Sequence, residues 1–224
     1  MIPGIVAGRA VAGGGGGGND PDWANVLALL HFDGVDGSTT FTDEKGGVWT
    51  RNGAAHIDTA QSKFGGASAR IVDSSSDFLI SPSLSFEDEF RIEFWFYRET
   101  TDAMYVLARN GGASSAFFLH AASGTNDLRL RWGGVDRETV AGGATVGAWN
   151  YVVIEQDGVI APRLYCNGIG GAATGGSATP FTDSLTFGAN SNNSLRLTGW
   201  IDEIRLSNQA LGTFTPPAAP FPNS

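Results

Sequence analysis

Short stretches of alternating apolar and polar residues follow one another from Trp23 onward, separated by glycine, asparagine, aspartate and serine. A period of two places successive side chains on opposite faces of a β-strand, whereas a helix would repeat every 3.6 residues. The clearest strand covers residues 90–97, where Phe90, Ile92 and Phe94 share one face with Phe96. The pattern predicts an all-β domain built from short strands.

Two more regions show the same alternation of apolar and polar residues. Residues 149–155 and 163–166 flank the turn-forming pair Asp157-Gly158, which predicts a hairpin-like connection. Residues 199–206 form the last predicted strand, and Asp202 has the parity of the apolar residue Ile204. Strict alternation therefore predicts that the Asp202 carboxylate points inward.

The chain divides into three parts. We predict an apolar arm and glycine linker over 1–22, one sandwich domain over 23–211 and a proline-rich tail over 212–224. Residues 13–18 are six consecutive glycines, a composition typical of a flexible linker, and the prolines of the tail cannot continue a sheet.

The arm carries apolar side chains with no partner in its own segment, which makes it a candidate anchor. Fully extended, the residues before position 19 would reach on the order of 60 Å at ~3.3 Å per residue. The proposed anchoring residues are Ile2, Pro3, Ile5, Val6 and Val11.

Composition and charge exclude several classes of partner. The net charge is −9, from 23 acidic and 14 basic residues, and the basic residues are scattered, so we expect no nucleic-acid ligand. The N-terminus lacks the basic region of a signal peptide, and no apolar stretch reaches the ~20 residues of a membrane helix. A single cysteine, Cys166, excludes an intrachain disulfide and predicts a buried, inert thiol. This cysteine content fits a protein that folds in a reducing cytoplasm, and it leaves bacterial secretion open.

Four segments in this order resemble the laminin-G-like, concanavalin A-like jelly roll of bacterial and bacteriophage proteins. They are His31-Phe-Asp-Gly with Ser62-Lys-Phe-Gly-Gly66, Phe90-Arg-Ile-Glu-Phe-Trp95, Trp149-Asn-Tyr-Val-Val with Leu164-Tyr-Cys-Asn-Gly168, and Gly199-Trp-Ile-Asp-Glu-Ile-Arg-Leu-Ser207. The resemblance covers about residues 24–211 and implies a two-sheet antiparallel sandwich. Because this fold hosts lectins, enzymes, adhesion modules and virion parts, it leaves the function open.

The N-terminal Met-Ile-Pro-Gly-Ile-Val followed by polyglycine is similar to the arms of tailed-bacteriophage structural proteins. That likeness implies a head decoration or tail-associated protein on the virion exterior, assembled in the bacterial cytoplasm. Its partners would be capsid or tail subunits, in a homo-oligomer or symmetric array. The alternative is a carbohydrate-binding or adhesion module that recognises a bacterial surface glycan.

The resemblance also implies one structural calcium ion. Related jelly rolls place it near Asp202, with Asp33 or its neighbouring carbonyl groups and the turn at Gly65 or Gly66. The alternative interpretation is that Asp202 accepts hydrogen bonds from backbone amides at a strand end.

A sugar site needs exposed rings for stacking together with amide and carboxylate groups. The candidates are Trp49, Trp132, Tyr105, Asn110, Asn126 and Asp136, whereas Trp95, Trp149 and Trp200 lie in the strand motifs and are predicted to be structural. No strand carries the paired carboxylates of a retaining glycosidase, and the three histidines lack the spacing of a triad or metal site. We therefore expect that the protein is not an enzyme.

Overall fold

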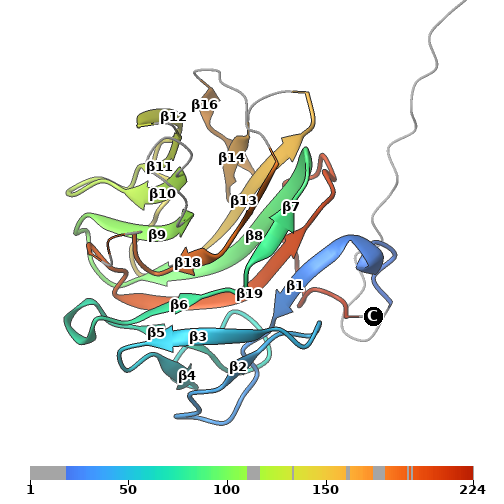
Figure 1. The fold of residues 1–224 in the computed structure, drawn as a ribbon. Coiled ribbons are helices and arrows are strands. Elements are labelled where there is room, and N and C mark those ends of the chain that lie inside the picture. Colours follow the sequence, from blue (N-terminus) through green and yellow to red (C-terminus); the bar gives the residue numbers. More distant parts are fainter. Residues whose placement is uncertain are drawn as a thin grey trace, which may run out of the picture.

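The computed structural model describes residues 19–109, 117–132, 134–159, 162–173, 180–190, 192 and 194–223. Within these ranges two antiparallel β-sheets face each other (Figure 1), which confirms the predicted all-β sandwich. The predicted anchor, Ile2 to Val11, and the polyglycine linker lie outside the described residues. Two 3-10 turns, Trp23–Asn25 and Asp73–Ser75, also occur, and no helix in this part of the chain has the length and apolar character to cross a membrane.

The first sheet has eight strands, and its centre is formed by the three longest strands of the chain. Its order is β15 (Ile169–Gly170), β14 (Arg163–Cys166), β13 (Trp149–Asp157), β8 (Glu89–Arg98), β19 (Gly199–Ser207), β5 (Ser68–Ile71) and β4 (His56–Asp58), with β1 (Val26–Leu30) also paired to β19. The strands predicted at 90–97, 149–155, 163–166 and 199–206 are thereby confirmed.

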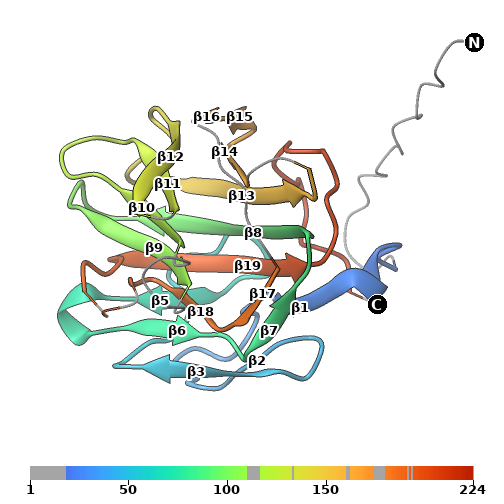
Figure 2. The same ribbon diagram turned by 45° about the horizontal axis from the view of Figure 1, so that its top comes forward.

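The second sheet has nine shorter strands. Its order is β16 (Ala172–Ala173), β12 (Val135–Val140), β11 (Leu128–Trp132), β10 (Phe117–Ala121), β9 (Met104–Arg109), β18 (Leu185–Phe187), β6 (Phe78–Ile80), β3 (Val48–Asn52) and β2 (Phe41–Thr42). A separate two-stranded ribbon joins β7 (Leu84–Phe86) to β17 (Phe181–Asp183). In Figure 2 the chain crosses between the two large sheets where β15 and β16 lie together.

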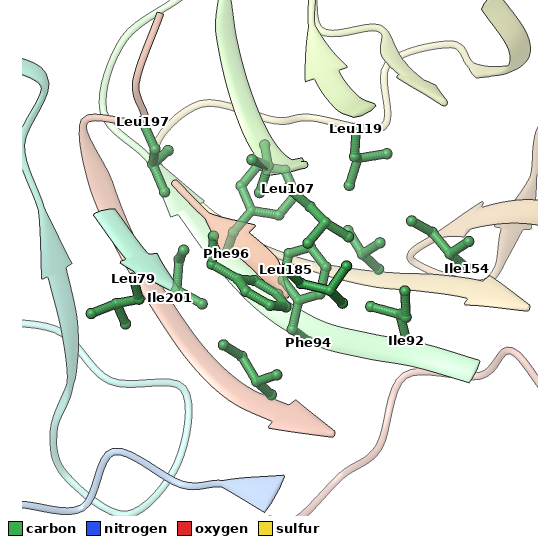
Figure 3. Packing of buried hydrophobic residues seen from close by; sticks show 14 of the residues in the cluster. Leu79, Ile92, Phe94, Phe96, Leu107, Leu119, Ile154, Leu185, Leu197 and Ile201 are labelled. Carbon is green, nitrogen blue, oxygen red and sulfur yellow. The ribbon is translucent and has the colours of Figure 1, made fainter. Parts of the chain in front are cut away.

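The main core fills the space between the two large sheets. On β8, alternate residues from Phe90 to Phe96 are fully buried in this core, as the sequence pattern predicts. Figure 3 shows side chains from both sheets meeting there, among them Ile92, Phe94, Leu107, Leu119 and Leu185. Cys166 is a buried free thiol in the same core, as predicted.

A β-bulge in β19 changes the face on which Asp202 lies. Both Ile201 and Ile204 belong to the core, and Glu203 between them has φ of 52°, in the left-handed region. Asp202 pairs with Trp95, whose ring lies on the outer face of the sheet. The prediction that Asp202 shares the face of Ile204 is therefore wrong, because the extra residue of a bulge inverts the alternation.

The proline-rich tail crosses the outer face of the eight-stranded sheet. The backbone amides of Gly212 and Phe221 donate to the carboxylates of Glu155 (3.1 Å) and Glu203 (2.9 Å). Its last described residues lie beside β1 in both views (Figures 1 and 2), where Phe221 packs into a second apolar cluster. The tail forms no strand among its described residues, as its prolines predict, and it encloses the face beneath it.

A network of charged side chains is buried under the tail. Glu93 accepts hydrogen bonds from Arg91 Nε (2.7 Å), the Tyr151 hydroxyl (2.5 Å) and Arg205 Nη1 (3.1 Å). Arg91 Nη1 also donates to Glu155 at 2.7 Å. Burial raises the pKa of Glu93, but the guanidinium groups of Arg91 and Arg205 outweigh that effect and hold the pKa below its ordinary value.

Candidate functional site

Strands β9 to β12 present polar and aromatic side chains on the outer face of the nine-stranded sheet. Residues that face the core alternate with these half-buried side chains, which is why β10 is buried at every second position. We call the outward set the β9–β12 patch; it comprises Tyr105, Phe118, His120, Arg129, Arg131 and Asp136.

The patch is ordered by strand register into two rows. In one row His120 pairs with Tyr105 on one side and Arg129 on the other, and their rings and guanidinium group lie side by side. In the second row Arg131 pairs with Phe118 and with Asp136. The Tyr105 ring centroid lies 5.5 Å from those of both Phe118 and His120, so the aromatic side chains form one continuous surface.

Asp136 is the acceptor at the centre of the patch. Its carboxylate lies 3.3 Å from His120 Nε2, 3.7 Å from Arg129 Nη1 and 3.8 Å from Arg131 Nη1. Burial lowers the pKa of His120, and the two arginines add to this effect, while Asp136 opposes it. Arg131 donates Nε and Nη2 to the carbonyl of Gly134 (3.0 and 2.7 Å), and Arg129 donates Nη2 to Asp127 (3.4 Å). The Nη1 groups of both arginines are left to bind a ligand, since their contacts with Asp136 are longer than the about 2.7–2.9 Å of an ordinary charge-assisted hydrogen bond.

The structure separates the predicted sugar-binding residues. Tyr105 and Asp136 lie together in the patch. Trp132 has the parity of the core residues of β11, and its ring stacks on Phe117 at 5.1 Å. Asn126 is exposed in the turn between β10 and β11.

Trp49 requires a correction. It is 3% exposed, packs on Phe187 in the core, and donates its indole N–H to Asp43 at 2.9 Å. A buried ring cannot stack against a sugar, so Trp49 is a core residue, and Asn110 lies outside the described residues.

The predicted calcium ligands converge on one turn. Asp202 is fully buried, and burial raises its pKa to about 8 although its carboxylate accepts the amides of Lys63 (2.7 Å), Phe64 (3.3 Å) and Glu203 (2.9 Å). Asp33 packs directly on Gly65 of the same turn, since a Cβ built at Gly65 would lie 1.6 Å from Asp33 Oδ1.

The groups around Asp202 are hydrogen-bond donors. Three amide hydrogens point at its oxygens. Burial lowers the pKa of the nearby Lys63, and the charge of Asp202 only partly opposes that effect. Gly66 of this turn has φ of 104°, and no cluster of three acidic, histidine or cysteine side chains suited to a metal occurs in the described ranges. These contacts match the alternative interpretation, in which Asp202 accepts hydrogen bonds from backbone amides, and a calcium ion here would have to take most of its six to eight oxygen ligands from backbone carbonyl groups and water.

A pocket of about 180 Å³ lies on the outer face of the eight-stranded sheet, away from the β9–β12 patch, where the tail crosses β13 and β14. We call it the tail pocket; it is lined by Glu155, Asp157, Arg163, Tyr165, Ala210, Gly212 and Phe214. No sequence pattern predicts this pocket, because residues 155–165 and 210–214 meet only in the fold. Arg129 and Arg131 were not among the predicted site residues, although the alternation Leu-Arg-Leu-Arg over 128–131 indicates that they share a face.

Several solved structures share this sandwich fold. Domain 4 of AbnA, a GH43 extracellular arabinanase from Geobacillus stearothermophilus, in complex with arabinotriose, superposes with a TM-score of 0.57 at 17% identity. The match covers 83% of this chain and 93% of that domain.

The receptor-binding domain of botulinum neurotoxin mosaic serotype C/D gives a TM-score of 0.59 at 11% identity and covers 86% of this chain. That of type G gives 0.53 at 12% identity and covers 84%. This chain spans about half the length of these toxin domains, with 50% and 49% covered. At such identities the likeness shows the fold alone.

A search of curated protein sequences found no match. Residues 73–213, more than half of the chain, match the family described as the concanavalin A-like lectin/glucanases superfamily. The sandwich fold, the order of its strands and this match together place the chain in the concanavalin A-like lectin/glucanases superfamily.

Proposed function

We propose that this chain is a non-enzymatic structural protein of a bacteriophage particle, which displays a lectin-like sandwich on the exterior of the head or tail. The main support is the junction between the linker and the domain. Six glycines end at residue 18, and Asp20, two residues later, forms a buried ion pair with Arg205 of β19. We expect a glycine linker that ends at a firmly held residue to let the arm bind one surface while the sandwich faces another.

The arm would bind neighbouring virion subunits through its apolar residues. Burial of apolar side chains contributes about 25 cal/mol per Å², and repetition through a homo-oligomer or symmetric array would add avidity to each weak contact. This proposal assigns no catalytic role to the domain.

Deletion of residues 1–18 tests the anchor. We expect the truncated protein to keep its thermal midpoint and to be lost from purified particles. A control variant with serine at Ile2, Ile5 and Val6 keeps the linker and should be lost in the same way. Normal incorporation of both variants would contradict the proposed anchor.

The second candidate function is recognition of a bacterial surface glycan by the β9–β12 patch. The observation that favours it is the Tyr105–Phe118 aromatic surface next to Arg129, Arg131 and Asp136. Aromatic rings stack on the apolar faces of sugars, while arginine donates to hydroxyl oxygens and aspartate accepts from hydroxyl groups. Domain 4 of the arabinanase, which has the same fold, is described in complex with an arabinose trisaccharide. The two proposed functions are compatible in one virion protein.

A glycan array probed with the intact protein tests this function. We expect Tyr105→Ala and Arg129→Gln to weaken binding about tenfold, given about 0.5–1.5 kcal/mol for an aromatic contact and 1.5–3 for a charged hydrogen bond. Arg51→Gln is the matched control, because Arg51 is an exposed arginine on β3 of the same sheet. Absence of binding on a broad array, or equal loss in the control, would contradict glycan recognition by the patch.

A further inference from the structure

The segment that forms β9 to β12 is basic, although the chain as a whole is acidic. Residues 104–140 carry four arginines against three acidic side chains, whereas the net charge of the chain is −9. Residues 110–116 and 133 lie outside the described ranges, and they include no charged side chain that would alter this count. A locally positive surface on an acidic protein favours an anionic ligand at that surface.

The β9–β12 patch keeps one excess positive charge after its neighbours are counted. Pairs of opposite charge occupy its borders: Arg98 with Asp102, Arg109 with Asp183, Glu138 with Arg163, and Arg196 with Asp73. Three arginines and two carboxylates remain on and beside the patch, namely Arg129, Arg131, Arg137, Asp127 and Asp136. Burial holds the pKa of His120 below its ordinary value of 6.5, so this ring adds little charge at pH 7.

Two guanidinium groups of the patch have donors to offer an anion. Arg131 uses Nε and Nη2 for the carbonyl of Gly134. Arg129 uses Nη2 for Asp127. The Nη1 groups of Arg129 and Arg131 lie 3.7 and 3.8 Å from the two oxygens of Asp136, and no other contact of either Nη1 is found among the described residues. Asp136 therefore draws the two Nη1 groups together without making an ordinary hydrogen bond of about 2.7–2.9 Å to either.

A ligand carboxylate matches this pair of donors. Its two oxygens lie in one plane, and each can accept a hydrogen from one Nη1 group, as in other contacts between arginine and carboxylate. One excess positive charge balances one carboxylate. A phosphate monoester carries about −1.5 to −2 at pH 7, so it would bring more negative charge than the patch can balance.

The strand register sets the length of the ligand. Phe118 pairs directly with Arg131, while Tyr105 and Arg129 pair with His120 from opposite sides. At ~4.8 Å per strand, Tyr105 and Arg129 are about 10 Å apart, which is longer than one sugar ring. A sugar whose carboxylate reaches the arginines lies against Phe118, and a second sugar is needed to stack on Tyr105.

We propose that the β9–β12 patch binds an acidic glycan, in which the Nη1 groups of Arg129 and Arg131 hold the carboxylate of a uronic acid unit and Tyr105 stacks on the adjacent sugar. The inference rests on the glycan recognition proposed for this patch and adds the substrate class of the site. Asp136 positions the two arginines and repels a second negative charge. A neutral glycan leaves both Nη1 groups without a charged partner and binds more weakly.

The experiment is isothermal titration calorimetry of the full chain at pH 7 with matched pairs of disaccharides. Each acidic probe joins glucuronic, galacturonic or mannuronic acid to a neutral sugar, and its partner is the methyl ester of the same disaccharide. The ester keeps the size and hydroxyl groups of the sugar and removes only its charge. We expect an acidic probe to bind at least about tenfold more tightly than its ester, as a charged hydrogen bond contributes.

Variants separate the charge from the stacking. Arg129→Gln and Arg131→Gln should each lower the affinity for the acid about tenfold and that for the ester much less. Tyr105→Ala should weaken both about two- to tenfold and leave their ratio unchanged. Arg51→Gln is the matched control, because Arg51 is exposed on β3 of the same sheet and should not alter either affinity. The thermal midpoint of each variant checks that the fold is kept.

Equal binding of acid and ester would overturn the acidic class and leave glycan recognition by the patch standing. Binding of the acid that both arginine variants leave unchanged would place the acidic site elsewhere, such as at the tail pocket, and would overturn the assignment. Tighter binding of a sulfated neutral disaccharide than of every uronic acid would overturn the carboxylate. Absence of binding with every disaccharide would overturn this inference alone if neutral glycans bind on the array, and both proposals for the patch if nothing binds there.

Discussion

Glu93 supplies the negative charge shared by two buried guanidinium groups, and its replacement by glutamine keeps the size of the side chain while removing that charge. The Glu93, Arg91 and Arg205 side chains are 1%, 3% and 7% exposed, so water cannot replace the lost partner. Breaking a buried ion pair by neutralising one member costs about 3–5 kcal/mol. We therefore expect Glu93→Gln to lower the free energy of unfolding by about that amount.

Urea denaturation followed by tryptophan fluorescence measures the effect. With an m-value near the upper end of ~1–3 kcal/mol/M, the loss shifts the midpoint by about 1–2 M. Glu99→Gln is the control, because the Arg70–Glu99 pair is at the surface and should contribute about 1 kcal/mol or less.

The pH dependence gives an independent check. The pKa of Glu93 in the folded protein is lowered, so its contribution to stability is present above the ordinary value of 4.5 and is lost as the pH falls through the folded pKa. The glutamine variant should lack this acid-dependent loss. A midpoint shift as small as that of Glu99→Gln, together with an unchanged acid profile, would refute the role of the buried network.

Four further predictions address the tail, the turn at Gly65, the thiol and calcium. Removal of residues 213–224 should lower stability by about 3 kcal/mol or more, because it uncovers two packed phenylalanine rings, and an unchanged thermal midpoint would contradict this. Gly65→Ala should cost roughly 1–3 kcal/mol, because φ is 63° and the new Cβ would overlap Asp33; a neutral effect in urea denaturation would show that the turn is adaptable. Cys166, whose pKa burial raises to about 12, should react with a disulfide reagent only after denaturation, so fast reaction of the native protein would count against the packing. Calcium and a chelator should leave the thermal midpoint unchanged, because amide hydrogens already hold Asp202, whereas a rise with calcium would restore the metal interpretation.

The long strands could be predicted because their side chains alternate without interruption. For residues 90–97 the alternation predicted correctly which side chains face the core, since burial between two sheets requires apolar residues at every second position. The same rule failed at Asp202, because one left-handed residue, Glu203, adds a bulge that no local pattern announces.

The sequence indicated which residue types could form a site better than it indicated where those residues lie in the fold. Tyr105 and Asp136 were candidates for a sugar site, and the fold brings them together through strands β9 to β12. Trp49 has the same aromatic ring as an exposed tryptophan that stacks on a sugar, but Trp49 is buried in the core, where Asp43 accepts its indole N–H. Burial depends on which segments pack together, and composition does not contain that information.

By itself the sequence determined that the chain forms short strands and that it can bury a sandwich core, and it predicts that a glycine linker separates an apolar arm from the domain. These properties are local, because they follow from the period of the side chains and from backbone freedom. Only the tertiary structure decided that the proline-rich tail covers buried charges, that four strands assemble the β9–β12 patch, and that Asp202 lies among amide hydrogens. Those features join residues far apart in the chain, and their energies depend on burial and distance, which arise only when the sheets are packed.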